Sequence, residues 1–426
     1  MNIRRFGWLA VLVCSATPAL AQQRDSLLDA LVQEALAQNP TVAQRQAAAR
    51  AATLRIRPAG ALPDPMLTAG VMDLVLPRFE FNRSEFTEVD AELSQTVPWP
   101  GSLGARAGAA KATAAGAHAE EHLTRREITA LMADAYYRLQ YAVSALASLR
   151  RQLRLFEAAV QLSTTRYGTG SAPQSDPLQA KLARDRLQLE ALAAEGDRMS
   201  ARAAVNALRN HAANDSVAVT PIDLASVRAG AVSPPAADSL VGIALLTNPR
   251  LAARHAAVDA AGQTIQIERL EGRPDFTLMA RYAYRPRVLG FNFPDFFSAF
   301  VGIRIPLWAS RKQHRLADAA RADYVAAGAE LRAAELQLGR DVTETAARVT
   351  AAQQRLVLLV DRILPAAEGT VESVLRSYQV GRAEFLTLLS VEDARYRAEL
   401  EAAAVAADYQ TQLVRLRQLT AEESRP

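Results

Sequence analysis

The sequence Tyr378-Gln-Val-Gly-Arg-Ala-Glu-Phe-Leu-Thr-Leu-Leu389 has a second version earlier in the chain, at Tyr167-Gly-Thr-Gly-Ser-Ala-Pro-Gln-Ser-Asp-Pro-Leu178. In each version a long helical pattern ends, breaks for a few residues around a glycine (Gly381 and Gly170), and resumes as a new helix. Self-similarity at a fixed spacing is the signature of a repeated structural unit. We therefore expect a duplicated unit with a sharp helical hairpin at its far end.

The N-terminus predicts a secretory signal peptide over residues 1–21. Two arginines precede a short apolar run, and Ala19-Leu-Ala21 supplies the small residues of a cleavage site. Cys14, the only cysteine, raises the alternative of a lipid-modified N-terminus, but the bulky Val13 before it favours cleavage after Ala21. The mature chain would then contain no cysteine and would depend on packing instead of disulfides.

Composition excludes several classes of protein. The formal net charge is only +4, and lysine occurs at three positions, so no basic block interleaved with aromatic residues suggests nucleic-acid binding. No stretch after the signal peptide approaches eighteen consecutive apolar residues, which argues against ordinary transmembrane helices. An exported chain of this kind is periplasmic, secreted or inserted in an outer membrane through strands.

Four segments show the two-residue period of strands. Phe86–Val97 alternates apolar and acidic or hydroxyl residues, and Phe276–Tyr284 and Phe296–Pro306 alternate in the same way. Met66–Leu74 is a weaker fourth candidate. Turn-rich loops join these segments in pairs, which predicts two hairpins. A small soluble sheet would suit the alternation as well, but strands of this length match a tilted strand that crosses a bilayer. Four strands are too few for a closed barrel, since the smallest have about eight, so membrane insertion would require several chains.

Heptads indicate long, packed helices between these strands and the repeated hairpins. One set of apolar positions runs every seven residues through the first half, with its companion set three or four residues away: Ile128, Ala135, Ala142, Leu149, Phe156, and Met132, Leu139, Leu146, Leu153, Val160. The second half repeats the pattern at Val342, Val349, Leu356 and Ile363, with Leu338, Ala352 and Leu359. Pro365 is expected to kink the second long helix. Asn39-Pro40 and Asn248-Pro249 are expected to restart a helix in each half.

The predicted fold is therefore mainly α with a small β part. The first repeat covers residues 22–211, with a β-hairpin at about 64–98 and a long helical hairpin at about 103–211. A proline-containing linker with little structure of its own follows at 212–237. The second repeat covers residues 238–421, with a β-hairpin at about 275–307 and a long helical hairpin at about 309–421. A frayed tail is expected at 422–426.

With these elements in order, the chain resembles the TolC-type outer-membrane efflux proteins, most of all their metal- and drug-efflux branch. The resemblance covers essentially the whole mature chain. It depends on the doubled order of helix, β-hairpin, long helix, tip turn and return helix, and on three short strings: Gln95-Thr-Val-Pro-Trp-Pro-Gly101, Ile363-Leu-Pro-Ala-Ala-Glu368 and Tyr378-Gln-Val-Gly381.

The resemblance implies a homotrimer in which four strands per chain form one twelve-stranded barrel in the outer membrane, with a long periplasmic helical tube. The function it implies is a passive exit duct that uses no cofactor and works with a periplasmic adaptor protein and an inner-membrane pump. Small molecules such as drugs or metal ions would pass through it. The sequence leaves that choice open.

The resemblance also implies a gate at the tips. Tyr378 matches a tyrosine that holds the family's gate closed, and Asp176, preceded by Ser175, matches its acidic acceptor. Arg382 lies one residue from the position of the family's arginine. Gly170 and Gly381, each three residues after a tyrosine (Tyr167 in the first half), are expected to form the tip turns. The family's inner acidic ring would fall at two uncharged residues, Thr387 and Ser390.

Two alternatives come from other classes of protein. One is a periplasmic coiled-coil scaffold that never enters the membrane. The other is a zinc hydrolase, because His118-Ala-Glu-Glu-His122 places two histidines on one face of a helix with a glutamate beside them. A hydrolase would also need a third ligand and a pocket, whereas this segment lies in an alanine-rich helix. His118 and His122 are therefore weak candidates for a metal site.

Overall fold

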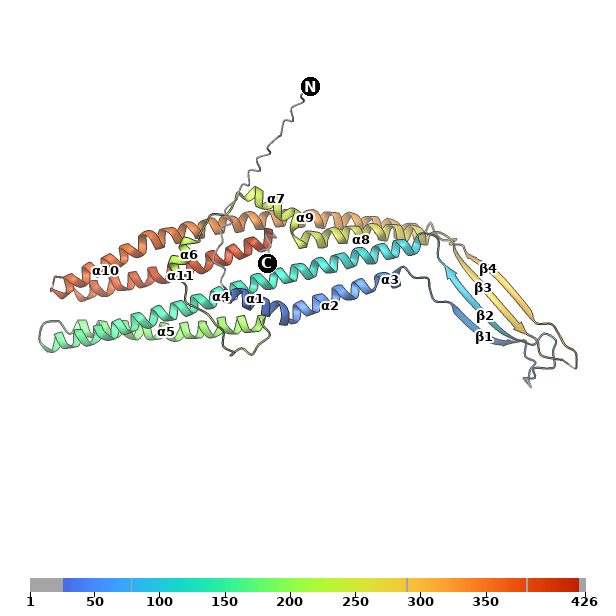
Figure 1. Cartoon of the computed structure of the whole chain (residues 1–426), viewed down its shortest axis with the longest axis horizontal. Coiled ribbons are helices and arrows are strands. Elements are labelled where there is room, and N and C mark those ends of the chain that lie inside the picture. Colours follow the sequence, from blue (N-terminus) through green and yellow to red (C-terminus); the bar gives the residue numbers. More distant parts are fainter. Residues whose placement is uncertain (1–25, 78, 289, 381, 421–426) are drawn as a thin grey trace, which may run out of the picture.

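The chain forms a long rod with a sheet at one end and two helical tips at the other. The computed structural model describes residues 26–77, 79–288, 290–380 and 382–420. Figure 1 shows the four strands on the right, the turns of two helical hairpins on the left, and helices running between them. The predicted signal peptide with Cys14, the tail and Gly381 lie outside the described residues.

Each half contributes short helices, two strands and two long helices. The first half contains α1 (Ser26–Gln38), α2 (Pro40–Leu54), α3 (Ile56–Ala59), β1 (Met66–Met72), β2 (Glu88–Val97), α4 (Ser102–Gly168) and α5 (Ser175–Leu208). The second half contains α6 (Leu224–Ala229), α7 (Ala237–Thr247), α8 (Pro249–Glu271), β3 (Asp275–Tyr284), β4 (Phe296–Arg304), α9 (Gln313–Leu358), η1 (Leu359–Ile363), α10 (Leu364–Gln379) and α11 (Phe385–Thr420). Within the described residues, no helix is both long enough and apolar enough to cross a membrane.

The Asn-Pro pairs start helices in the two halves by the same contacts. The Asn39 side chain accepts a hydrogen bond from the Thr41 N–H at the start of α2, at 2.9 Å, and its amide donates to the Leu208 carbonyl at the end of α5. Asn248 accepts from the Arg250 N–H at the start of α8, also at 2.9 Å, and donates to Leu419 near the end of α11. Each asparagine therefore caps one helix and ties it to the return helix of its own repeat.

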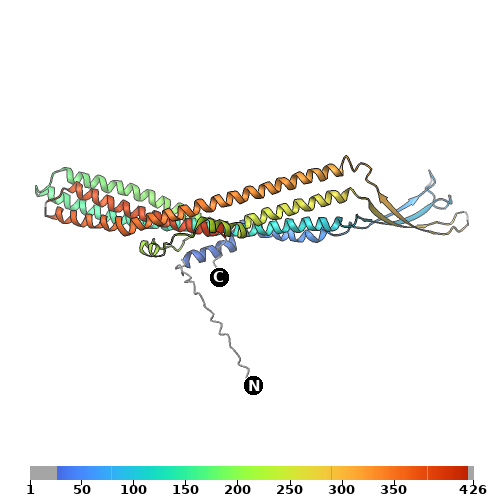
Figure 2. The same cartoon turned by 90° about the horizontal axis from the view of Figure 1, so that it is seen from above.

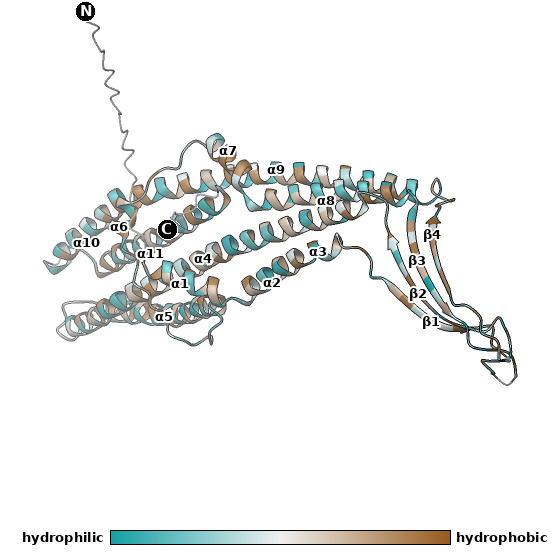
Figure 3. Cartoon of the chain, turned by 45° about the vertical axis from the view of Figure 1, so that its right-hand side comes forward, coloured by the Kyte–Doolittle hydropathy of each residue, from teal (hydrophilic) through white to brown (hydrophobic). Residues whose placement is uncertain are grey.

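The four strands form one antiparallel sheet in the order β1-β2-β3-β4. The registers place Ala69, Ala91 and Tyr282 in one row across β1, β2 and β3. Because successive side chains point to opposite faces, every residue two positions away lies on the same face. The large side chains of this face are exposed: Leu67, Val71, Val89, Leu93, Leu278, Tyr282, Tyr284, Phe297, Val301 and Ile303. The alternation predicted from the sequence is confirmed, and Figure 3 shows it as changes of hydropathy along the strands.

The opposite face of the sheet is charged along β2 and β3, whereas β1 and β4 place Met66, Met72, Phe296 and Phe300 on it. Glu88, Asp90 and Glu92 alternate with the apolar residues of β2, and Arg281 of β3 lies opposite Glu92. The Arg281 guanidinium donates to the Asp90 carboxylate at 3.1 Å and also pairs with Glu88. These side chains are only partly exposed. The sheet thus combines an exposed apolar face with a second face that carries linked charges on its two central strands.

The predicted heptads form the core between the long helices. Ile128, Met132 and Leu139 of α4 pack in one cluster with α1, α2 and Val205 of α5. In the second half, nearly all the predicted positions are buried in another cluster, which α11 completes: Leu338, Val342, Val349, Ala352, Leu356 and Leu359.

Ile363 is the exception to the predicted heptads, because its side chain is 39 % exposed. The five residues of η1 form a π-helical turn, in which the Leu364 N–H bonds to the Leu359 carbonyl five residues back. Pro365 lacks an N–H and its ring clashes with the carbonyl four residues before it, and a π-turn absorbs both effects. The extra residue shifts the helical phase, and Ile363 leaves the buried stripe as a result.

The linker at 212–237 is more ordered than expected. It contains α6, and its Ile222 N–H donates to the Ser144 hydroxyl of α4 at 2.7 Å. Further on, the Tyr409 hydroxyl of α11 accepts from the Val232 N–H at 3.0 Å and donates to the Val232 carbonyl at 3.2 Å. Arg228 of α6 pairs with Asp361 of the π-turn at 2.7 Å. The prolines of this linker prevent a long helix, but its backbone groups form hydrogen bonds with side chains of α4 and α11.

Removal of the Tyr409 hydroxyl should destabilise the middle of the rod. Tyr409→Phe leaves the N–H and carbonyl of Val232 without a partner, and we expect a loss of about 1–3 kcal/mol in unfolding free energy. Chemical denaturation of the purified protein in detergent measures it. Tyr324→Phe, at a largely exposed tyrosine of α9, is the matched control and should leave the midpoint unchanged. Equal midpoints for the two variants would contradict the assigned role of Tyr409.

Candidate gate at the helical tips

Both helical hairpins turn at the end of the rod that lies farthest from the sheet (Figures 1 and 2). The first turn joins α4 to α5, and the second joins α10 to α11. After α4, the Ser171 N–H donates to the Arg166 carbonyl at 2.8 Å and the Gly170 N–H donates to the Tyr167 carbonyl. This pair of bonds is the Schellman motif, which ends a helix with a residue of positive φ, here Gly170 at +73°.

The second turn repeats the same outer bond. After α10, the Arg382 N–H donates to the Ser377 carbonyl at 2.8 Å, and these two residues match Ser171 and Arg166 of the first turn. The duplication seen in the sequence therefore extends to the hydrogen bonds that end each long helix.

The two tip tyrosines have opposite environments. Tyr167 is 46 % exposed, whereas Tyr378 is 5 % exposed. The Tyr378 ring packs at 5.8 Å from the Phe385 ring and belongs to a small apolar cluster with Ala180 of α5. Because Ala180 comes from the first hairpin, this cluster lies between the two hairpins. Tyr378 is therefore a contact between the repeats, and Tyr167 is a surface residue.

Arg166 completes the contact between the tips, and sequence reasoning missed it. Its guanidinium lies over the Tyr378 ring, 4.9 Å from the centroid. A cation at this position is attracted by the negative face of the ring. Arg166 and Tyr378 come from different repeats, so nothing in their local spacing announces the pair. The one sequence signal nearby is Tyr167, which follows Arg166 and aligns with Tyr378 in the second repeat.

The predicted hydrogen bond from Tyr378 to Asp176 is not formed within this chain. The Tyr378 hydroxyl is buried and has no hydrogen-bond partner among the described residues. Asp176 is partly exposed and accepts instead from the neighbouring Ser175 hydroxyl, at 3.3 Å. Arg382 is exposed, and the described contacts do not join it to either residue. Within the chain, Tyr378 thus contacts the first hairpin through apolar packing and through Arg166, and not through a hydrogen bond to Asp176.

Thr387 and Ser390 lie on the first turns of α11. Both are exposed, and the Ser390 hydroxyl donates to the Thr387 carbonyl at 2.8 Å. This pair carries no charge. The side chains at these two positions cannot attract cations by charge.

The two histidines of the His-x-x-Glu-His string lie on an exposed face of α4. His118 lies 3.0 Å from the Thr53 hydroxyl of α2, and its other ring nitrogen is 3.7 Å from Glu121. His122 is also exposed. Over the part of the chain that the structure describes, no group of three or more potential ligands is arranged to hold a metal ion.

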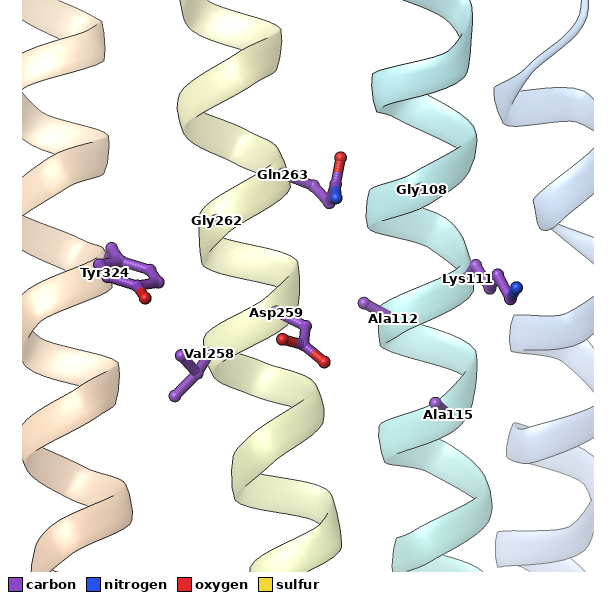
Figure 4. A pocket seen from close by; sticks show the side chains of 9 residues that line it. All are labelled: Gly108, Lys111, Ala112, Ala115, Val258, Asp259, Gly262, Gln263 and Tyr324. Atoms are coloured by element: carbon purple, nitrogen blue, oxygen red, sulfur yellow. The ribbon is translucent and has the colours of Figure 1, made fainter.

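A cavity of about 500 Å³ lies between α4, α8 and α9, on the sheet side of the rod. Figure 4 shows Asp259 and Gln263 of α8 directed toward α4, while Lys111 points away from α8. Gly108 and Gly262 make room for it, and the Tyr324 ring closes the side of α9. Its described lining contains one acid and one base on opposite sides. This arrangement does not form an acid–base pair for catalysis.

The model of the outer membrane efflux protein family matches residues 31–211 and 240–422. The chain belongs to that family. It is an outer-membrane channel of the kind that serves tripartite efflux pumps, and it is not an enzyme. Membership therefore excludes the zinc hydrolase and the scaffold that never enters the membrane.

Solved outer-membrane channels share this fold. The channel OprN matches with a TM-score of 0.80 and 19% identity, over 94% of this chain and 91% of OprN. VceC from Vibrio cholerae matches with a TM-score of 0.76 and 20% identity, over 92% and 95% of the two chains. The open state of MtrE from Neisseria gonorrhoeae gives 0.76 and 18%, over 92% and 88%. A search of curated proteins found no match.

The positive φ of Gly170 predicts a local cost for any side chain. A Cβ on Gly170 would meet no atom within 4 Å, so the cost of Gly170→Ala is purely one of backbone conformation, about 1–2 kcal/mol. Hydrogen exchange of the Ser171 amide should become faster, because its bond depends on that turn. Gly168→Ala, also in open space but at the helical end of α4, is the control and should leave exchange unchanged or slower. Equal exchange in both variants would contradict this explanation.

Proposed function

We propose that three copies of this chain form one passive exit duct, closed at the periplasmic tips and open through the sheet. The observation that carries the proposal is the sheet itself. Its outer strands β1 and β4 each have one unpaired edge, and one of its faces is apolar and exposed. Unpaired edges and a bare apolar face are unstable in water, and pairing β4 of one chain with β1 of the next removes the edges.

Three four-stranded sheets give about twelve strands, above the minimum of about eight for a closed barrel. In such a barrel the apolar face contacts lipid and the face with Arg281, Glu88 and Asp90 lines the passage. In β2 and β3 the apolar residues alternate in register with mostly polar or charged residues, which matches the alternation that membrane strands require.

In this proposal the tips are the gate. The Tyr378 hydroxyl is buried without a partner in the single chain, and buried hydroxyls almost always have one. In the closed trimer, where the tips crowd together, we propose that Tyr378 donates to the Asp176 carboxylate and that Arg382 and Ser175 add polar contacts. Arg166 holds the Tyr378 ring in place. Opening then consists of hairpins that move apart after these contacts break, a change between two packings.

The proposed partners follow from the position of the tips. A periplasmic adaptor protein would dock on the helical hairpins, and an inner-membrane pump would supply the energy for export. The duct itself selects little, and the pump determines whether drugs, other small molecules or metal ions are exported.

The gate is tested by conductance in planar lipid bilayers. Tyr378→Phe combined with Arg382→Ser removes the hydroxyl donor and the charge, and we expect a clear increase of single-channel conductance. Tyr167→Phe, the equivalent but exposed position of the first repeat, is the control and should conduct as the unmodified protein does. An unchanged conductance in the double variant would count against the gate.

The orientation of the strands is tested on β4 and β2. Val301→Arg places a charge on the face proposed to contact lipid, and we expect destabilisation of about 2–4 kcal/mol if the residue lies near the middle of the membrane. Ser94→Arg, on the opposite face of the sheet and paired with the uncharged Met66 and Met279, should be tolerated. The amount of trimer that resists dissociation in mild detergent, recovered from outer membranes, measures both. Equal recovery of the two variants would overturn the proposed orientation.

A further inference from the structure

A polar network crosses between the two helical hairpins at some distance from the tips. It joins Ser148, Arg151 and Gln152 of α4 to Glu392, Arg395 and Glu399 of α11. Ser148 lies more than twenty residues before Gly170, which corresponds to roughly 30 Å along the helix at 1.5 Å per residue. The network is therefore separate from the tip contacts.

Two carboxylates and two guanidinium groups alternate in this network. The Ser148 hydroxyl donates to the Glu399 carboxylate at 2.8 Å, and Arg151 donates to the Ser148 oxygen at 2.9 Å and pairs with Glu399 as well. Arg395 donates across the interface to the Gln152 side-chain oxygen at 3.2 Å. The same guanidinium contacts Glu392 at 3.2 Å and Glu399 at 3.5 Å. Arg395 is the one residue that bonds to both carboxylates and to α4.

The network is buried on one side only: the Arg151 side chain is 54% exposed, and those of Arg395 and Glu399 are 26% and 23% exposed. Ser148, Gln152 and Glu392 are only 7%, 2% and 6% exposed. An apolar cluster lies along the same interface, formed by Leu149, Phe156, Leu187 and Tyr396. Burial raises the pKa of the Tyr396 hydroxyl, and the neighbouring Glu190 adds to the rise. Charged hydrogen bonds in such surroundings are strong, and the loss of one partner leaves the other charge buried and unpaired.

The tips are held much less firmly within the chain. There the hairpins meet through the apolar cluster around Tyr378 and the contact of Arg166 with its ring. The Tyr378 hydroxyl has no partner among the described residues. The two hairpins of one chain are thus joined strongly at the network and weakly at the tips.

We infer that the network of Ser148, Arg151, Gln152, Glu392, Arg395 and Glu399 is a clamp that keeps the two hairpins of each chain together while the channel opens. The moving part of each chain is then the segment between the clamp and the tip. The clamp residues are positioning residues, since they hold the helices that carry Tyr378 and Arg166. This inference depends on the proposed gate at the tips.

The first test removes the clamp. Arg395→Gln and Glu399→Gln should each speed amide hydrogen exchange of α4 and α11 beside the network, in the closed and in the open channel alike, because the clamp is present in both states. We expect an increase of the exchange rate on the order of tenfold, which equals about 1.4 kcal/mol, because the pair of Arg395 with Glu399 is partly buried and the substitution leaves one charge without its partner. Arg397→Gln is the matched control. Arg397 lies on the same helix but pairs only with Asp393 of that helix and is highly exposed. An Arg395→Gln channel that behaves as the control does would overturn the clamp.

The second test locks the helices together in the intact channel. Cys14 is the only native cysteine and lies in the predicted signal peptide, so introduced cysteines can be joined selectively by a short cleavable bis-thiol reagent. Ser148→Cys with Glu399→Cys locks the clamp. Arg166→Cys with Tyr378→Cys locks the tip.

The clamp cross-link, made in the background of Tyr378→Phe and Arg382→Ser, should leave the raised conductance unchanged. The tip cross-link should shut the channel until the reagent is cleaved. A channel that is shut by the clamp cross-link overturns the clamp while the gate stands. If neither the tip substitutions nor the tip cross-link changes conductance, the gate itself is overturned, and the two failures are thereby distinguished.

Discussion

The packing of α11 against α4 connects the hydrophobic cores of the two repeats. Residues of α11 enter the core of the second half, with Ala402, Val405 and Tyr409 buried among α9 and η1. Other residues of the same helix, Ala407 and Val414, pack on the core of the first half. Since α11 contacts both cores, it joins the helical parts of the two repeats, as the pairing of β2 with β3 joins their strands.

The two repeats share the features that begin and end their helices, and they differ at the residues that form the contact between the tips. The asparagine caps and the outer bond that ends α4 and α10 are the same in both halves, because each is a local solution to the unsatisfied backbone groups of a helix end. The tyrosines before the two turns differ in burial, because one faces the other hairpin and the other faces solvent. The duplication thus supplies two similar tips, and the contact between them forms because the tyrosine is buried in one tip and exposed in the other.

The sequence was sufficient for the features that depend on period. Alternation in β2, β3 and β4 identified the apolar face, and the heptads identified most of the buried stripe of α4 and α9. It failed where a residue's partner lies far away in the chain. Arg166 and Tyr378 are neighbours only after both hairpins have formed, and the bonds of Tyr409 to Val232 depend on how the linker crosses α11. Periodicity shows which side of a helix faces inward. It does not show which residue of another helix a buried side chain will contact.

The π-turn at Leu359–Ile363 has a consequence for the distant tip. An α-helix turns by about 100° for each residue, so one extra residue rotates everything that follows it about the helix axis. The whole of α10, including Tyr378, therefore owes its angular setting to a turn well over ten residues away. With an uninterrupted α-helix the tyrosine would face a different direction and miss the first hairpin. Pro365 and the π-turn before it therefore rotate α10 by a fixed angle, and this rotation directs the Tyr378 side chain toward the first hairpin.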